Sequence, residues 1–486
     1  MYQADIVIVG AGVVGCAIAR ELSRYDLQVL VVDKRDDVGG DASKSNSSIA
    51  ITGFDCPPGS LEARLCHETR ARFDHVTKEL DVPFRVCGAL MPAITPEQME
   101  RLPAIYDEAM ANGVTDVVYL TPEEILAKEL EINPAVLGGL YIPREAVIDP
   151  FLYVVALAEN AAANGVKFLL RCEVTGMTVE NGAITAVETT QGAIRTKYVI
   201  NAAGLYGDEI ARMAGEEIDY TVKPRKGQFF ILDRSTPCKT EAVIYPIPTP
   251  TSRGKLLLQT VHGNMLLGPT AEDGEDKTDH STTAEELAGI ERDCRQLVPN
   301  IRVSDTITQY SGLRPNRTPA GFHIAFGEKT AGYFEVGGVR STGVSCSLGI
   351  ARYVADQFRA AGVELREKED FSPIRRGIPR FAGADNEKRE QLLAEDPLYG
   401  RIICRCETVT EAEIVQAIHR DPPATTVDAV KRRLRAGMGR CQGGFCGPKV
   451  MEILSRELGI PMEQVEKNLP GSYLTTGPVR GGKEDA

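Results

Sequence analysis

Four cysteines near the C-terminus are spaced like the ligands of a metal centre. Cys404 and Cys406 form a C-x-C pair, and Cys441 and Cys446 form a C-x4-C pair further along the chain. Four thiolates brought together in two pairs can hold either zinc or an iron–sulfur cluster. We interpret all four as metal ligands, with unligated structural cysteines as the alternative.

Short helices are expected between and after the two cysteine pairs. Thr410 and Glu413 have the spacing of a capping box, and apolar residues recur at helical spacing over 427–434. Cys446 opens a further helix, whose N-terminal dipole favours bound thiolates. The sequence therefore predicts a small all-α metal-binding domain over 399–460.

A glycine motif at the start of the chain has the setting of a dinucleotide site. A buried-strand pattern at 6–9 runs into Gly10, Gly12 and Gly15, then into an amphipathic helix, and the next apolar strand ends at Asp33. In such a motif the glycines form a tight turn that a pyrophosphate can approach, and the carboxylate accepts from a ribose hydroxyl. The predicted contacts of this part are Gly10, Gly12, Val13, Val14, Gly15, Asp33 and Lys34.

Further segments could contact the same cofactor. A polar stretch covers 41–48, with an ordinary loop as its alternative reading. A buried strand ends in small residues at 199–204, and 333–343 leads from a strand into a helix whose start could receive negative charge. The residues predicted from these segments are Ser43, Asn46, Ser47, Val174, Ala203, Gly204, Gly338, Arg340, Ser341, Thr342 and Gly343.

The two sites together favour FAD over NAD. The sequence holds no second G-x-G-x-x-G after a strand, so we expect one dinucleotide. If the four cysteines hold an iron–sulfur cluster, that cluster carries one electron at a time, whereas a hydride carries two. A flavin can divide that pair and a nicotinamide cannot readily do so.

Residues 220 to 310 contain short β-rich runs separated by turns, which indicates a sheet domain. Arg314 and Arg317 follow directly, and a guanidinium fork suits a carboxylate or a phosphate. A base for an alcohol proton is not evident. The catalytic candidates are Arg314, Arg317, His67, Lys226 and Tyr245, while a turn role is favoured for His262.

The composition limits the function classes. A formal net charge of −13 and a pI near 5.2 make nucleic acid an unexpected partner, so an anionic substrate needs a local basic pocket. The other eight of the twelve cysteines are scattered and read as core or incidental thiols. We expect several domains and a cytoplasmic location without an integral membrane segment, with a peripheral position at the inner membrane face through a partner left open.

Several motifs resemble those of the glycine/D-amino-acid oxidase-like flavoprotein superfamily, more closely its glycerol-3-phosphate and L-2-hydroxyglutarate dehydrogenase branches. They are the glycine motif, Ser45-Asn46-Ser47, residues 57–65, the Ala-Ala-Gly at 202–204, Ser311-Gly312-Leu313-Arg314-Pro315, and Arg340-Ser341-Thr342-Gly343. The cysteine region resembles the bacterioferritin-associated ferredoxin-like [2Fe-2S] domain, which favours a cluster over zinc. In one departure, many relatives carry a His just before the Ala-Gly or Ser-Gly of the first motif, where this chain has Ile51-Thr52-Gly53.

The resemblance implies a discontinuous α/β FAD-binding Rossmann-type domain, an antiparallel β-sheet substrate domain and a small all-α [2Fe-2S] domain. The expected bounds are 1–85, 145–215 and 310–362 for the FAD-binding domain, 86–144 and 216–309 for the substrate domain, 363–398 for a linker, 399–460 for the [2Fe-2S] domain and 461–486 for a tail.

The same resemblance implies oxidation of glycerol 3-phosphate to dihydroxyacetone phosphate, with Arg314 on the phosphate. It also implies transfer of electrons from FAD through the cluster to an electron-accepting partner protein. Two alternatives remain open: a dehydrogenase of a 2-hydroxy acid or of an amino or imino acid, and an electron-transfer subunit without a substrate of its own.

Overall fold

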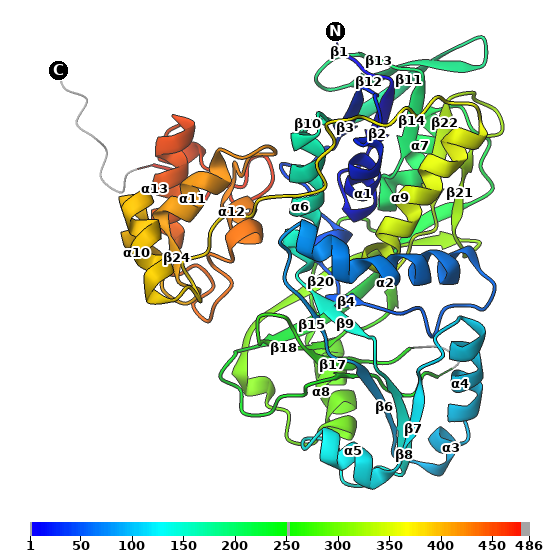
Figure 1. Cartoon of the computed structure of the whole chain (residues 1–486), viewed down its shortest axis with the longest axis vertical. Helices are drawn as coiled ribbons and strands as arrows, with labels where there is room; N and C mark the ends of the chain where they lie inside the picture. Colours follow the sequence, from blue (N-terminus) through cyan, green and yellow to red (C-terminus); the bar gives the residue numbers. More distant parts are fainter. Residues whose placement is uncertain (1, 250–252, 478–486) are drawn as a thin grey trace. The chain divides into compact units, whose positions relative to one another are not determined.

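The computed structural model describes residues 2–249 and 253–477, which divide into two compact units (Figure 1). The first unit comprises residues 1–34 and 38–376, and the second comprises residues 35–37 and 377–486. Within the described ranges, no helix is long and apolar enough to cross a membrane.

A six-stranded, mostly parallel sheet forms one layer of the first unit. Its strands, in order across the sheet, are β10 (Lys167–Leu169), β3 (Val29–Val32), β2 (Ile6–Val9), β14 (Tyr198–Asn201), β22 (Tyr333–Gly337) and β21 (His323–Phe326). All neighbours pair in parallel except β22 and β21. Strands β2 and β3 are buried along their whole length, as expected for valine- and isoleucine-rich strands covered on both faces.

Helices pack against this sheet and begin where its strands end. α1 (Val13–Leu22) contacts α6 (Pro150–Ala163) and α9 (Gly343–Ala360), and α9 also contacts α2 (Leu61–Glu79). α1 follows the carboxyl end of β2, and α9 follows that of β22. Ligands of open α/β sheets bind at the carboxyl ends of the strands, so both helix starts lie where a cofactor is expected.

A nine-stranded sheet forms a second layer, and all its neighbours are antiparallel except β16 and β6. Its path is β19 (Glu272–Asp273), β15 (Thr221–Leu232), β18 (Met265–Gly268), β17 (Leu256–Gln259), β16 (Val243–Ile244), β6 (Ala89–Ala93), β8 (Gly138–Ile142) and β7 (Val118–Leu120), with β20 (Thr306–Thr318) paired to β15. The predicted mixed α/β fold with an antiparallel sheet is thereby confirmed.

The remaining elements of the first unit are smaller. Two further sheets contain β1 (Tyr2–Gln3), β13 (Ile194–Arg195), β12 (Ala183–Thr189) and β11 (Val174–Glu180), and β4 (Ile49–Ala50), β9 (Ala146–Ile148) and β5 (Phe84–Val86). The other helices are α3 (Pro96–Met99), α4 (Leu102–Ala111), α5 (Pro122–Lys128), α7 (Gly207–Met213) and α8 (Ala284–Leu297).

The second unit is mainly helical around its own apolar core. It contains α10 (Asn386–Glu395), β23 (Ile402–Cys404), β24 (Val409–Thr410), α11 (Glu411–Ile418), α12 (Val427–Leu434) and α13 (Gly447–Leu458). The capping box of Thr410 and Glu413 is present at the start of α11. The short β23–β24 ribbon is an addition to the predicted all-α domain, and it places Cys404 at a strand end.

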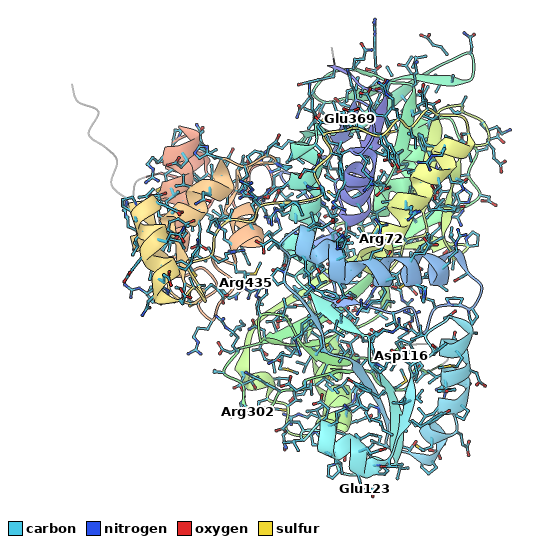
Figure 2. All side chains as sticks on the ribbon, viewed as in Figure 1. Arg72, Asp116, Glu123, Arg302, Glu369 and Arg435 are labelled. Carbon is cyan, nitrogen blue, oxygen red and sulfur yellow. The ribbon has the colours of Figure 1, made fainter. Side chains whose placement is uncertain are left out.

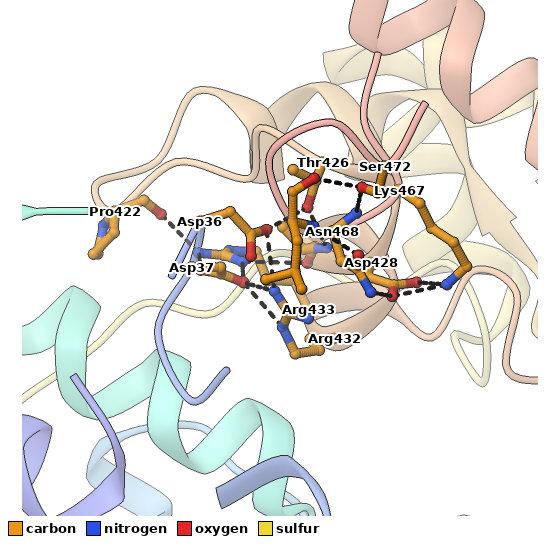
Figure 3. A network of polar contacts seen from close by, with 12 residues as sticks. Asp36, Asp37, Pro422, Thr426, Asp428, Arg432, Arg433, Lys467, Asn468 and Ser472 are labelled. Atoms are coloured by element: carbon orange, nitrogen blue, oxygen red, sulfur yellow. Dashed lines mark hydrogen bonds and ion pairs between the residues drawn. The ribbon is translucent and has the colours of Figure 1, made fainter. Parts of the chain in front are cut away.

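Residues 35–37 join the second unit through a buried ionic network (Figure 3). Asp37 is fully buried and accepts hydrogen bonds from Arg433 at 2.8 and 2.9 Å and from Arg432 at 2.8 and 3.1 Å. Asp36 accepts a 2.8 Å bond from the hydroxyl of Thr426. Burial opposes ionisation of Asp37, but Arg433 and Arg432 outweigh it and lower the pKa of this carboxyl.

Replacing Asp37 by Asn is expected to lower the free energy of unfolding of the second unit by about 3 kcal/mol, because two buried guanidinium groups lose their counter-charge. Urea unfolding followed by far-UV circular dichroism measures this loss. Asp36→Asn is the matched control. Burial raises the pKa of Asp36, so replacing its carboxyl by a neutral amide is expected to lower the free energy of unfolding less than Asp37→Asn does. Equal losses for the two variants would contradict the assignment of Asp37 as the central charge.

The pH dependence of the stability of the wild-type protein gives a second check of the role of Asp37. Because the pKa of Asp37 is lowered on folding, its contribution is present above the ordinary carboxyl pKa of 3.8 and disappears as the pH falls through the lower folded value. Asp37→Asn is expected to remove this part of the acid sensitivity.

Candidate functional site

The glycine motif folds into a tight turn between β2 and α1. Gly10 has a φ of 106°, and a Cβ atom on it would lie 2.5 Å from the carbonyl oxygen of Ala202. A Cβ atom on Gly15 would overlap the carbonyl oxygen of Gly10. Gly12 precedes α1 and offers no side-chain cap. The turn is therefore bare backbone at a helix start whose own N-cap residue has no side chain, so a pyrophosphate can approach it closely.

Polar side chains from neighbouring segments hold this turn. The amide of Ala11 donates to the Asp33 carboxylate at 2.7 Å, and the amide of Val13 donates to the Ser43 hydroxyl at 2.9 Å. Asn46 donates to the carbonyl of Ser43 at 2.7 Å. The predicted polar stretch over 41–48 thus lies against the glycine motif.

The start of α9 adjoins the start of α1. A Cβ atom on Gly343 would lie 3.4 Å from Val13 Cγ1 and 3.9 Å from Val14 Cγ2. Predicted residues from separate segments therefore meet at one place: Gly10, Gly12, Val13, Val14, Gly15, Asp33, Ser43, Asn46, Ala203 and Gly343. This cradle fits the adenosine diphosphate half of FAD.

The other predicted cofactor residues have separate surroundings. Lys34 Nζ lies 3.2 Å from the centre of the Tyr206 ring, and the Thr342 hydroxyl donates to Glu62 at 2.7 Å. Val174 is buried at the start of β11. Gly204 and Gly338 have φ values of 54° and 77°, Ser47 is half-buried, and Ser341 is exposed.

Arg314 lies at the centre of a group of arginines. It sits on β20 directly opposite Arg225 of β15. Its guanidinium donates to the carbonyls of Arg225 at 3.3 Å and Thr270 at 3.2 Å. A Cβ atom on Gly227 would overlap this guanidinium, so the glycine leaves the space that Arg314 occupies.

The arginine cluster, defined here as Arg225, Arg253, Arg314 and Arg340, has more positive than negative charge. Burial and the charges of Arg225, Arg340 and Arg253 lower the pKa of Arg314 to about 10. Arg225 pairs with Asp273 at 2.6 Å and Arg253 with Asp55 at 3.3 Å. Within the described chain, Arg314 and Arg340 form no ion pair with a carboxylate. Like charges placed opposite one another are unfavourable, so the cluster favours an anion.

Three other catalytic candidates lie outside this cluster. Arg317 stacks on Tyr220 at 4.2 Å and donates to the carbonyl of Pro319. It faces away from Arg314 because residues three apart on a strand face opposite sides. His67 is exposed on α2. Lys226 pairs with Asp279 at 2.8 Å.

Sequence reasoning missed a buried carboxylate beside the fifth candidate, Tyr245. Glu145 is fully buried in the turn between β8 and β9. One of its oxygens accepts from the amide and hydroxyl of Thr52 at 2.6 and 2.7 Å, and the other accepts from the Tyr245 hydroxyl at 3.1 Å. Burial raises the pKa of Glu145 to about 7. No motif surrounds Glu145, so only the three-dimensional contacts reveal it.

The four C-terminal cysteines come together as two pairs. Cys406 and Cys441 have sulfurs 3.7 Å apart, and the thiol of Cys446 donates a hydrogen bond to the sulfur of Cys404. In the part of the chain that is described, no three potential ligands converge closely enough for a single metal ion. Four cysteines in two neighbouring pairs match a [2Fe-2S] cluster, in which each iron takes two thiolates.

The surroundings of the cysteines lower the pKa of Cys404 and Cys441 but raise the pKa of Cys406 and Cys446. Hydrogen bonds from Cys446 and from backbone amides outweigh burial and lower the pKa of Cys404 to about 6. A Cβ atom on Gly439 would overlap that of Cys406, so a larger residue there would displace the ligand. Arg435, labelled in Figure 2, donates to Glu407 beside Cys406 at 2.8 Å and fixes this segment.

Comparisons with known proteins cover both units. Residues 5–357 match the DAO family, described as FAD dependent oxidoreductase, and residues 402–456 match the BFD-like [2Fe-2S] binding domain. Glycerol 3-phosphate dehydrogenase of Caloramator mitchellensis is 41% identical over 98% of this chain and 99% of that protein. One subunit of the anaerobic glycerol-3-phosphate dehydrogenase of Escherichia coli K12 is 25% identical over 93% of this chain and 88% of its own length.

A solved structure shows the same fold. L-alpha-glycerophosphate oxidase from Mycoplasma pneumoniae, reduced by dithionite and with FAD bound, superposes with a TM-score of 0.74 and 27% identity, over 78% of this chain and all of that one. These matches confirm the predicted flavoenzyme class and both predicted cofactors. The chain belongs to the FAD dependent oxidoreductase family and carries a BFD-like [2Fe-2S] binding domain in its C-terminal part.

Proposed function

We propose that this protein oxidises glycerol 3-phosphate to dihydroxyacetone phosphate and passes the electrons from FAD to its [2Fe-2S] cluster and then to a partner protein. The observation that carries the substrate assignment is the arginine cluster. A phosphate monoester has close to two negative charges and three acceptor oxygens at neutral pH, so it can satisfy several guanidinium groups at once. A single carboxylate carries one charge and matches one guanidinium fork.

The named relatives support this assignment. The bacterial protein that aligns along nearly the whole chain is a glycerol 3-phosphate dehydrogenase, and the superposed structure is an oxidase of the same compound. When bound, FAD supplies the oxidant that takes two electrons from the carbinol carbon. Arg314 and its neighbours hold the phosphate, which leaves the substrate hydroxyl free to meet a proton acceptor.

The surface beside the cysteines supports a protein as the electron acceptor. Phe445 precedes Cys446 and is 81% exposed, and Arg405, Arg440 and Lys449 are exposed in the two segments that hold the cysteines. An exposed aromatic ring among cations suits an acidic protein partner. The Escherichia coli relative is itself named as one subunit of an enzyme.

The substrate assignment is tested by anaerobic mixing of the holoprotein with candidate substrates. We expect glycerol 3-phosphate to bleach the flavin absorbance at concentrations where L-2-hydroxyglutarate and proline do not. Bleaching by L-2-hydroxyglutarate instead would favour the 2-hydroxy acid alternative. A flavin that none of the three reduces, but that a reduced partner protein does, would favour an electron-transfer subunit.

Replacing Arg314 by Leu is expected to weaken glycerol 3-phosphate binding roughly 100-fold, or about 2.7 kcal/mol, through loss of a charged donor pair. Arg314→Lys keeps the positive charge but lacks the guanidinium fork. Its dissociation constant is expected to lie between those of Arg314→Leu and the wild type. The measurement is the dissociation constant obtained from flavin spectral shifts with the phosphate-containing product.

Arg317→Leu is the matched control, because Arg317 lies on the same strand but faces Tyr220. Its dissociation constant is expected to stay within about threefold of the wild type, as for a site without ligand contact. A larger loss for Arg317→Leu than for Arg314→Leu would contradict the proposed phosphate site.

A further inference from the structure

We propose that Tyr245 and Glu145 form the proton-accepting pair of the substrate site: Tyr245 takes the proton of the substrate hydroxyl while its own proton passes to Glu145. This inference rests on the proposed oxidation of an alcohol and assigns the base that this reaction needs. Thr52 is the residue that positions the pair.

A chain of contacts places the pair beside the arginine cluster. The ring of Tyr245 lies 5.7 Å from that of Phe54, and Asp55, the next residue, pairs with Arg253 of the cluster at 3.3 Å. Arg253 is also close enough for its charge to act on the pKa of Tyr245. A small substrate whose phosphate lies on the arginines can therefore present its hydroxyl to Tyr245.

The two side chains of the pair differ in burial and therefore in role. Glu145 has no exposed surface, and both of its carboxylate oxygens are engaged by Thr52 and Tyr245. Tyr245 is half-buried, so it is the side chain of the pair that a substrate can reach. Tyr245 is thus the catalytic residue, and Glu145 acts through it.

The step balances in atoms and electrons. The carbinol C–H bond breaks, and its hydrogen leaves with both electrons to the oxidised flavin. The substrate O–H bond breaks, and the proton goes to the Tyr245 oxygen as the tyrosine proton goes to a Glu145 oxygen. The carbon–oxygen double bond of the ketone forms. Glu145 ends protonated, and both redox electrons are on the flavin.

The charges that face the pair agree with this direction of transfer. Burial, Glu145 and Asp55 raise the pKa of Tyr245 well above its ordinary value, so the tyrosine is protonated before the reaction. Glu145 faces Asp55, the partly buried thiol of Cys87 and the hydrogen bonds of Thr52, and with its pKa raised to about 7 it is a carboxylate above that pH. The rate of flavin reduction is therefore expected to rise as the pH increases through about 7 and then to level off.

The test is anaerobic stopped-flow reduction of the FAD-loaded protein at pH 5.5 to 9, as suits a pKa of about 7. Glu145→Gln and Tyr245→Phe are each expected to slow flavin reduction about 100-fold or more, the usual range for loss of a general base. Both are expected to bind dihydroxyacetone phosphate within about threefold of the wild type, because the arginine cluster is intact. Glu145→Gln is also expected to lose the rise of the rate near pH 7.

Glu129→Gln is the matched control. Glu129 is a buried glutamate of the same unit whose pKa burial also raises, but it accepts from the backbone amides of Ala242 and Glu241 and not from Tyr245. Its rate and pH profile are expected to match those of the wild type. Thermal unfolding of every variant separates a catalytic loss from misfolding.

Thr52→Val distinguishes a positioning role of Thr52 from a merely structural one, because only a positioning role changes the pH profile of flavin reduction. Loss of the Thr52 hydroxyl bond to the carboxylate raises the pKa of Glu145 further, so the midpoint of the pH profile is expected to move to higher pH. Wild-type rates with an unchanged pH profile in Glu145→Gln would overturn the proposal.

The same experiments distinguish failure of the glycerol 3-phosphate assignment from failure of the proton-accepting pair. The series is run with whichever of glycerol 3-phosphate and L-2-hydroxyglutarate reduces the wild-type flavin. If L-2-hydroxyglutarate alone reduces the flavin, the phosphate assignment is overturned. The Glu145 and Tyr245 variants then still decide the role of the pair. Reduction by neither alcohol, or by an amino acid only, overturns the pair as the acceptor of a hydroxyl proton.

Discussion

The proposed chemistry of this molecule depends on the repulsion among four clustered guanidinium groups. Strand pairing places Arg314 opposite Arg225, and Gly227 gives Arg314 the space to lie there. Burial and the nearby positive charges lower the pKa of Arg314, so a cluster without an anion is unfavourable. In a chain with a net charge of −13, such a concentration of positive charge is a local exception. An anion offsets the cost, and a phosphate offsets more of it than a carboxylate.

The same sheet connects the arginine cluster to the cofactor cradle. Tyr310 on β20 donates to the carbonyl of Asn46 at 2.7 Å, and a Cβ atom on Gly312 would overlap the carbonyl oxygen of Ser45. The strand that carries Arg314 is therefore packed tightly against the segment that reaches the glycine motif through Ser43. The second unit has the other requirement of the proposed chemistry, two pairs of cysteines that suit a one-electron carrier.

Sequence patterns predicted the features that depend on local order. The glycine motif and the cysteine pairs each combine fixed spacing with a neighbouring strand or helix, and the structure places them as those patterns require. Arg314 was chosen as a candidate through its motif, and its role stays a prediction. Its difference from Arg317 follows from the two-residue period of a strand, which a motif match alone does not reveal.

Features that depend on contacts between distant segments were not predictable. Glu145 and Thr52 are 93 positions apart, and no pattern marks Arg253 as a neighbour of Arg314. The joining of residues 35–37 to the second unit depends on Asp37 meeting Arg432 and Arg433 across 395 and 396 positions. Such contacts are set by packing of the whole chain, which single-sequence patterns do not encode.

The proposed function requires that one chain takes two electrons from a phosphorylated alcohol and divides them between a flavin and its own cluster. The most direct test is anaerobic addition of glycerol 3-phosphate to the holoprotein, with visible absorption and electron paramagnetic resonance recorded on the same sample. We expect bleaching of the flavin together with the signal of a reduced [2Fe-2S] cluster. A bleached flavin beside a cluster that stays oxidised, or no iron–sulfur absorption at all, would contradict this function.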